Sequence, residues 1–326
     1  MLPSNAFANS GVQVSRIGFG AMGLNGSFGA LEEKEYIEAL LRSFELGVTF
    51  VDTARAYGTS EETIGKALKE WNGPRPFIAT KVKPWGKGGW GSPIPVTEAF
   101  PPGSIRQSVE ASLQALQVEA LDLIQMHQYW GIWDDEPYWL EELIRLKEEG
   151  MVRHIGVSIP DHRHDMAISL VRSGHIQSVQ TILNIFDPLA LDNLAPLCEK
   201  HGVALIARCV LDEGGLTGLL RENTIFGDRD FRNGYFDAGP RTEYLARVEK
   251  LKEFVPAYAN SLTALAIKYA LHYPAVTTAI ISMQVKSYAE ENIAALLEEP
   301  LPEEVFDQLF KQHRWIRNFY QKKYWR

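Results

Sequence analysis

Short apolar runs alternate along the chain with longer segments in which apolar side chains recur at helical spacing. Leu140, Leu143 and Leu146, for example, fall on one face of a predicted helix. Strands that alternate with helices pair in parallel, because each helix returns the chain to the same end of the sheet. The apolar runs are nearly continuous, which is typical of a sheet buried on both faces. Eight strands are predicted, beginning near Arg16, Thr49, Phe77, Leu121, Val152, Ser178, Ala204 and Thr277.

The predicted helices favour one closed barrel. Several of them end on glycine, at Gly47, Gly150 and Gly202, where a left-handed residue closes the last turn. Eight strand–helix units in 326 residues fit an α/β fold of the (β/α)8 TIM barrel type, and no linker or change of composition supports the alternative, a doubly wound sheet with a second domain. We therefore predict a single barrel domain over residues 1–326. Helices are expected over Glu33–Leu46, Glu61–Trp71, Ser104–Leu116 and Leu140–Glu149.

Four further segments add to the predicted barrel. An N-terminal β-hairpin with its turn at Gly11 is expected to close one end of the barrel, and a C-terminal helix over Glu303–Arg326 is expected to pack outside. Val82–Pro102 and Leu211–Thr242 are longer than ordinary loops and follow strands. Active sites of such barrels form where the strands end, so both segments are predicted to be walls of a pocket.

The composition narrows the class of protein. Hydrophobic residues make up 45% of the chain and charged residues 23%, which is typical of a folded globular protein. The net charge of −8 without a basic tract argues against nucleic acid as a partner. No apolar run is long enough for a membrane span, and Met1–Ser10 lacks the features of a secretion signal. Two cysteines, Cys198 and Cys209, provide no disulfide framework, and no metal site is predicted. We expect a cytoplasmic protein that binds a small molecule, of undetermined oligomeric state.

Four polar residues lie at or just beyond the ends of predicted strands. Asp52 and Tyr57 come from FVDTARAYG, Lys81 is the second-last residue of FIATKV, and His127 ends LIQMH. A buried lysine needs a partner, which Asp52 provides. A positive charge near a phenol lowers its pKa from about 10, so Lys81 is expected to make Tyr57 a proton donor near neutral pH. A neutral His127 is suited to orienting a carbonyl group.

Two other patterns are weaker. Gly18–Gly23 matches the dinucleotide pattern G-x-G-x-x-G, but no helix opens directly after it, so we do not interpret it as a Rossmann motif. Asp161–Asp165 contains two histidines among acidic residues, yet this spacing does not place both histidines on one helix face. We interpret this segment as helix capping and surface.

The chain resembles the aldo-keto reductases. FVDTARAYG, FIATKV, LDLIQMH, GMVRHIGVS, GGLTG and EENIAA occur in the order found in that family. The resemblance implies a (β/α)8 barrel that binds NADP(H), with NAD(H) as the other possible cofactor, and that reduces aldehydes or ketones. By position, Tyr57 is similar to the general acid, Lys81 to the residue that tunes its pKa, Asp52 to the partner of Lys81, and His127 to the group that orients the carbonyl.

The same resemblance implies a set of cofactor contacts. The sequence differs from the family pattern at three of these positions. Ile159 stands where asparagine is frequent, and Arg208 stands where an aromatic ring often stacks on the nicotinamide. Gln284 lies near the position at which a basic residue often binds the 2′-phosphate. Lys286 is the nearest cation in sequence. The implied cofactor residues are Gly20, Ala21, Met22, Ser158, Gln180, Arg208, Leu211, Gly214, Gly215, Leu216, Ser282, Gln284, Lys286, Glu291 and Asn292.

The substrate pocket and the exact function stay open at this stage. Trp85, Trp90 and Trp130 are expected to line the pocket. Two alternatives to a reductase are a Schiff-base aldolase that uses Lys81 and a regulatory barrel that binds a cofactor with little turnover. The identity of the substrate and the direction of the reaction cannot be predicted from loop sequences.

Overall fold

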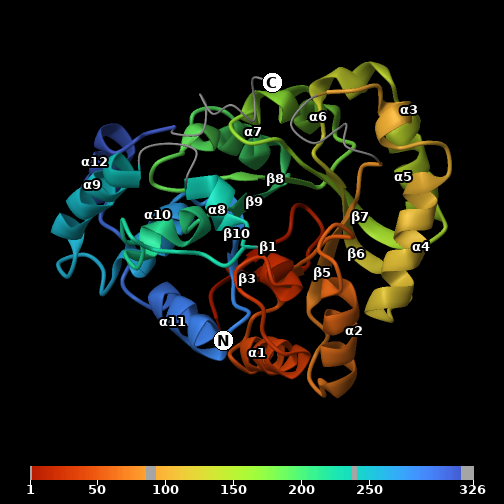
Figure 1. The fold of residues 1–326 in the computed structure, drawn as a ribbon. Helices are drawn as coiled ribbons and strands as arrows, with labels where there is room; N and C mark the ends of the chain where they lie inside the picture. Colours follow the sequence, from red (N-terminus) through yellow and green to blue (C-terminus); the bar gives the residue numbers. More distant parts are fainter. Residues whose placement is uncertain (1, 86–92, 229, 237–240, 317–326) are drawn as a thin grey trace.

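Eight parallel strands form a closed barrel in the order β10-β3-β4-β5-β6-β7-β8-β9 (Figure 1). The computed structural model describes residues 2–85, 93–228, 230–236 and 241–316. Every barrel strand lies at one of the predicted strand positions, so the predicted (β/α)8 barrel is confirmed. The strands are β3 (Ile17–Gly20), β4 (Phe50–Asp52), β5 (Phe77–Val82), β6 (Leu121–His127), β7 (Val152–Ser158), β8 (Ser178–Ile182), β9 (Ala204–Arg208) and β10 (Val276–Ser282).

Helices surround the barrel and bury their apolar faces against it (Figure 1). In α1, Tyr36, Leu40 and Phe44 recur every four residues and are buried. No helix in the described ranges has the length and hydropathy that crossing a bilayer requires. The helices are α1 (Glu33–Glu45), α2 (Ser60–Glu70), α3 (Val96–Ala99), α4 (Ser104–Leu116), α5 (Tyr138–Glu148), α6 (Ile168–Ser173), α7 (Leu194–His201), α8 (Arg232–Phe236), α9 (Arg241–Leu251), α10 (Leu262–His272), α11 (Lys286–Leu296) and α12 (Glu303–Gln312).

The N-terminal hairpin closes the end of the barrel at which the strands begin. Strands β1 (Ser4–Ala6) and β2 (Gln13–Ser15) pair in antiparallel fashion, with Gly11 between them at a φ of 77°. Phe7 follows β1 and is fully buried against Phe50 and Phe77, the first residues of β4 and β5, at ring-centroid distances of 6.4 and 4.6 Å. The predicted hairpin is therefore confirmed.

The C-terminal helix is shorter than predicted. α12 ends at Gln312 rather than Arg326. Beyond it, Arg314 pairs with Asp192 at 2.6 Å, and the backbone N–H of Trp315 donates to the carbonyl oxygen of Phe186 at 2.7 Å. The Trp315 N–H thus bonds to the segment that precedes α7 and not to a carbonyl oxygen of α12, so the helix does not continue. Residues 317–326, with Tyr320 and Trp325, lie outside the described part of the chain.

The strand register brings polar side chains together where the strands end. Ser282 of β10 lies opposite Gly20 of β3, which in turn lies opposite Asp52 of β4. On the other side of the barrel, His127 of β6 pairs with Ser158 of β7, and Ser158 pairs with Gln180 of β8. Both rows lie at the C-terminal ends of parallel strands, which is where such barrels carry their sites.

Candidate active site

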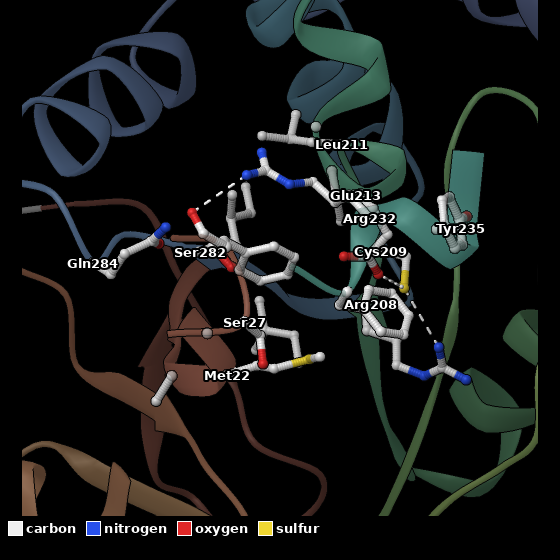
Figure 2. Close-up of a pocket in the computed structure, with 18 of the residues that line it drawn as sticks. Met22, Ser27, Arg208, Cys209, Leu211, Glu213, Arg232, Tyr235, Ser282 and Gln284 are labelled. Atoms are coloured by element: carbon white, nitrogen blue, oxygen red, sulfur yellow. Dashed lines mark hydrogen bonds between the residues drawn. The ribbon is translucent and has the colours of Figure 1, made fainter. Parts of the chain in front are cut away.

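A cavity of about 950 Å³ opens at the C-terminal ends of the barrel strands. Strand-end residues, including Asp52 and His127, form one part of its lining, and the long segment after β9 forms a wall. Figure 2 shows Gln284 and Ser282 on one side of this cavity, with Arg208 and Tyr235 on the other. For the described residues of Leu211–Thr242, the prediction that this segment forms a pocket wall is therefore confirmed.

A buried ion pair joins Lys81 and Asp52. Lys81 is 0% exposed, and its Nζ donates to the Asp52 carboxylate and, at 2.9 Å, to the carbonyl oxygen of Thr53. The second Asp52 oxygen accepts a hydrogen bond from Gln180 at 2.8 Å. Burial lowers the pKa of Lys81, but Asp52 and Tyr57 raise it by more, so the pKa lies above its ordinary value. Lys81 is therefore a fixed positive charge at neutral pH.

Tyr57 lies in the turn after β4, close to both this charge and His127. Lys81 Nζ is 5.1 Å from the centroid of the Tyr57 ring, and the His127 ring is 5.8 Å away and nearly perpendicular to it. Burial raises the pKa of the Tyr57 phenol by more than the charge of Lys81 lowers it. The expectation that Lys81 brings this pKa below its ordinary value is therefore wrong, because exclusion of water has the larger effect. The phenol keeps its proton at neutral pH.

His127 is a neutral base in the same cavity. It ends β6 and is 8% exposed. Burial, together with the positive charges of Lys81 and Arg208, holds the pKa of His127 well below its usual range. A neutral imidazole donates one hydrogen bond from one ring nitrogen and accepts one at the other. The structure therefore places a phenol and a neutral imidazole next to each other at the cavity, as the positions in the sequence predict.

Arg208 anchors a polar cluster on the side of the cavity away from Gln284 (Figure 2). Its guanidinium pairs with Asp161 at 2.8 Å and donates to the Cys209 sulfur at 3.4 Å, and the Cys209 thiol donates to Glu213 at 3.1 Å. Burial lowers the pKa of Arg208, but Asp161 and the Cys209 sulfur raise it by more. Asp161 thus lies in the cavity wall, and its interpretation as a capping or surface residue is wrong. No spacing in the sequence links it to Arg208, 47 residues away.

Most residues implied for cofactor binding lie in the cavity wall. Gly215 does not, because the Tyr244 hydroxyl occupies the space beside its Cα, where a Cβ would come within 2.0 Å. Leu216 is buried in the core and is not part of the wall either. The implied cofactor residues that do line the cavity are Gly20, Ala21, Met22, Ser158, Gln180, Arg208, Leu211, Gly214, Ser282, Gln284, Glu291 and Asn292.

Gln284 lines the cavity, whereas Lys286 lies outside it. Gln284 is 5% exposed, packs against Gly23 and lines the cavity, and its Oε1 has no hydrogen-bond partner among the described residues. Lys286 instead begins α11 and pairs with Glu38 of α1 at 2.8 Å, outside the cavity. The assignment of Lys286 to the cofactor site is therefore not supported, because Glu38 holds its ammonium group. A buried, unpartnered amide oxygen in the wall suits a ligand that brings a hydrogen-bond donor.

Neither of the two described tryptophans expected in the substrate pocket lines the main cavity. Trp85 is 54% exposed and lines a second, smaller cavity. Trp130 is buried in the hydrophobic core and does not line the main cavity, so its placement in the pocket is wrong. Trp90 lies outside the described residues. Exposure of a loop tryptophan depends on how the loop folds, which the spacing of residues does not encode.

A bridge between two loops was not predicted. Arg232 donates to the carbonyl oxygen of Phe28 at 3.3 Å, and its guanidinium lies over the rings of Phe28 and Phe226, at 5.6 and 4.6 Å from their centroids. All three residues line the cavity. The contact joins the loop after β3 to the long segment after β9. Because 204 positions separate Arg232 from Phe28, no local pattern indicates it.

Comparisons with known proteins agree with this geometry. The model of the aldo/keto reductase family matches residues 16–312. Aldo-keto reductase YhdN of Bacillus subtilis is 29% identical over 290 residues, which cover 84% of this chain and 83% of that protein. The NADH-specific methylglyoxal reductase of Escherichia coli is 25% identical over 304 residues, covering 87% and 90% of the two chains.

A solved structure extends the comparison to the fold. Aldo-keto reductase AKR11C1 from Bacillus halodurans superimposes with a TM-score of 0.74 at 25% identity, covering 96% of this chain and all of that one. The family match spans all eight barrel strands and every residue of the Asp52, Tyr57, Lys81 and His127 group. The chain therefore belongs to the aldo/keto reductase family, and it is an oxidoreductase that acts on carbonyl or alcohol groups.

Proposed function

We propose that this single-domain barrel reduces aldehydes or ketones to alcohols and that Tyr57 donates the proton. The observation that carries the proposal is the position of Tyr57, beside the Lys81 ammonium and the His127 ring at the edge of the cavity. The cavity is also lined by most of the residues that the family resemblance assigns to a nicotinamide cofactor. When bound, such a cofactor supplies a hydride to the carbonyl carbon.

The side chains of this chain account for the proton. As the carbonyl oxygen gains negative charge, the phenol proton moves to it and leaves a phenolate next to Lys81. The raised pKa of Tyr57 keeps the phenol protonated until that moment. Lys81 is held in place by Asp52, so its charge favours the phenolate as it forms. We assign to His127, which is neutral because its pKa is held well below the usual range, a hydrogen bond donated to the same oxygen.

The residues that the family resemblance implies for cofactor binding line the cavity both at the strand ends and on α11. Ser158 and Gln180 at the ends of β7 and β8 would hold the nicotinamide carboxamide, and Glu291 and Asn292 of α11 would hold the adenine. Gly20 lies beside these residues and lets β3 pack closely against β10, because a Cβ there would lie 3.1 Å from the carbonyl carbon of Ile281.

For the choice of cofactor, we propose that NADP(H) is preferred over NAD(H) by a small margin. The preference follows the family resemblance. The margin is small because Gln284 is neutral and Lys286 is paired with Glu38, which leaves a 2′-phosphate without the basic partner that it normally has. The existence of a relative named for NADH specificity supports keeping NAD(H) as the second candidate.

The aldolase alternative fits the structure less well. A Schiff-base lysine must be accessible and must lose its proton to attack a carbonyl. Lys81 is fully buried, does not line the cavity and has a raised pKa. The alternative of a regulatory barrel predicts that the protein binds NADPH but oxidises none with any carbonyl compound.

The direct test is to incubate the purified protein with NADPH or NADH and a panel of aldehydes, ketones and sugars. We expect the cofactor to be oxidised and the matching alcohol to form in equal amounts. Borohydride trapping is expected to leave Lys81 unmodified. Cofactor binding without oxidation across the panel, or a trapped adduct on Lys81, would overturn the proposal.

A further inference from the structure

A second cavity, of about 460 Å³, lies between the loops that follow β4 and β5 and one face of α4. It is lined by Arg55, Lys83, Pro84, Trp85, Ser104, Gln107, Ser108 and Ala111. The four α4 residues recur at intervals of three and four positions, so one face of that helix forms a wall. None of the residues considered so far for catalysis or cofactor binding contributes to it.

The charge of this cavity is positive. None of the described residues that line it is acidic. Arg55 is neutralised by the buried carboxylate of Glu61, with which it pairs. Lys83 is exposed and makes no ion pair with any described residue. The cavity therefore presents an uncompensated ammonium group, a situation that favours an anionic ligand.

A buried hydroxyl on α4 supplies an independent indication of a ligand. Ser104, the first residue of the helix, is 5% exposed, and its Oγ has no hydrogen-bond partner among the described residues. Buried polar groups of proteins are nearly always hydrogen-bonded, so an unpartnered donor in a cavity wall indicates a missing acceptor. Its position in the first turn of a helix of 13 residues adds the positive end of the helix dipole. Gln107 and Ser108 add further donors on the same face.

The second cavity adjoins the first. Lys83 lines both of them. Arg55 belongs to the turn that carries Tyr57, and its backbone N–H donates to the carbonyl oxygen of Lys81 at 3.4 Å. A substrate whose carbonyl group lies at Tyr57 thus has a positively charged cavity beside it.

We propose that this second cavity binds the anionic group, a carboxylate or a phosphate, of the carbonyl substrate. Lys83 provides the charge, the Ser104 hydroxyl provides a hydrogen bond, and the Trp85 ring at the rim contacts the carbon chain. The inference rests on the proposed reductase function and narrows its substrates to anionic aldehydes or ketones.

The test compares pairs of aldehydes that differ only in an acidic group: succinic semialdehyde with butanal, and 4-carboxybenzaldehyde with benzaldehyde. The quantity measured is kcat/KM for the acidic aldehyde divided by kcat/KM for its neutral partner, at saturating cofactor. In Lys83→Gln this ratio is expected to fall at least about tenfold, because a hydrogen bond to a charged group is lost. Ser104→Ala is expected to lower it by about threefold to tenfold. Lys69→Gln, at an exposed α2 lysine that lines neither cavity, is the matched control and is expected to leave the ratio unchanged.

Inorganic phosphate distinguishes a substrate group from a free anion. We expect phosphate to compete with the acidic aldehyde and to compete less well in Lys83→Gln. If phosphate changes turnover without competing with the acidic aldehyde, and Lys83→Gln removes this effect, the cavity binds a free anion and the proposal is overturned. A ratio that both variants leave unchanged would also overturn it. The neutral aldehydes report separately on the reductase function, because their reduction and its dependence on Tyr57 do not involve the second cavity.

Discussion

The buried Lys81–Asp52 pair predicts a defined loss of stability when its negative charge is removed. Asp52→Asn keeps the size of the side chain but leaves the ammonium of Lys81, which is 0% exposed, with only uncharged oxygen partners such as the Thr53 carbonyl. Removing one partner of a buried ion pair costs about 3–5 kcal/mol, because the other charge stays desolvated. We expect the free energy of unfolding at neutral pH to fall by about that amount.

The pH dependence of this loss has a predictable sign. In the unmodified protein the pKa of Lys81 is raised, so its stabilising contribution is complete below the unfolded pKa of about 10.4 and is lost as the pH rises through the folded value. In Asp52→Asn, burial lowers the pKa of Lys81 without a carboxylate to oppose it. The unfolded chain then binds more protons than the folded one between the lowered pKa and about 10.4, so the stability of the variant rises with pH in that window.

Urea titrations followed by circular dichroism at pH 6, 7.5 and 9 measure both effects. The double variant Asp52→Asn/Lys81→Met removes both charges and is expected to recover most of the lost stability. Asp307→Asn, at an exposed pair with Lys311, is the matched control and is expected to change stability by less than about 1 kcal/mol. A loss in Asp52→Asn no larger than in this control, or a double variant no more stable than the single one, would refute the reasoning.

Three further predictions follow from individual contacts. Phe7→Ala is expected to lower the free energy of unfolding by about 3–5 kcal/mol, because it empties the fully buried space against Phe50 and Phe77. The kcat is expected to stay within about twofold, since the hairpin lies at the end of the barrel away from the cavity. Thermal melts measure the stability and steady-state assays measure kcat. Gln284→Arg is expected to raise the ratio of the NADH to the NADPH dissociation constant by about tenfold, because a guanidinium would pair with the 2′-phosphate. Lys286→Ala is expected to change this ratio by less than about twofold, because Glu38 already pairs with the Lys286 ammonium. Fluorescence titration at low and high salt measures the ratio, and a large effect of Lys286→Ala would contradict the observed pairing. Because the pKa of His127 is held well below its usual range, kcat/KM is expected to show no break from a histidine between about pH 6 and 8; a break near neutrality that His127→Gln removes would show that this imidazole is charged.

The barrel could be predicted from the sequence because its signals are local. Apolar runs such as Phe77–Val82 and helical repeats such as Ser104–Leu116 each identify one element, and the observed β5 and α4 have the same bounds. The end of α12 could not be predicted in this way. It depends on contacts of Arg314 and Trp315 with residues far away in the sequence, and tertiary contacts of this kind override local helix propensity.

The same distinction between local signals and tertiary contacts applies to the candidate site. Asp52, Lys81 and His127 could be placed because each lies on a strand, and parallel strands bring their ends to one rim. The sequence does not predict whether the pKa of Tyr57 lies above or below its ordinary value, because this depends on how much water the fold excludes. Asp161 was misassigned for a related reason: its partner Arg208 comes from a different strand, and their pairing exists only in the folded chain.

Tyr57→Phe tests most directly whether Tyr57 donates the proton. Removing one hydroxyl is expected to lower kcat for aldehyde reduction by about 10²- to 10⁴-fold, because the hydroxyl acts only as charge develops on the substrate oxygen. The dissociation constant of NADPH, measured by fluorescence, is expected to stay within about twofold. Tyr258→Phe, at a tyrosine that does not line the main cavity, is the matched control and keeps full activity. A kcat for Tyr57→Phe within about threefold of the unmodified enzyme would contradict the role assigned to this phenol.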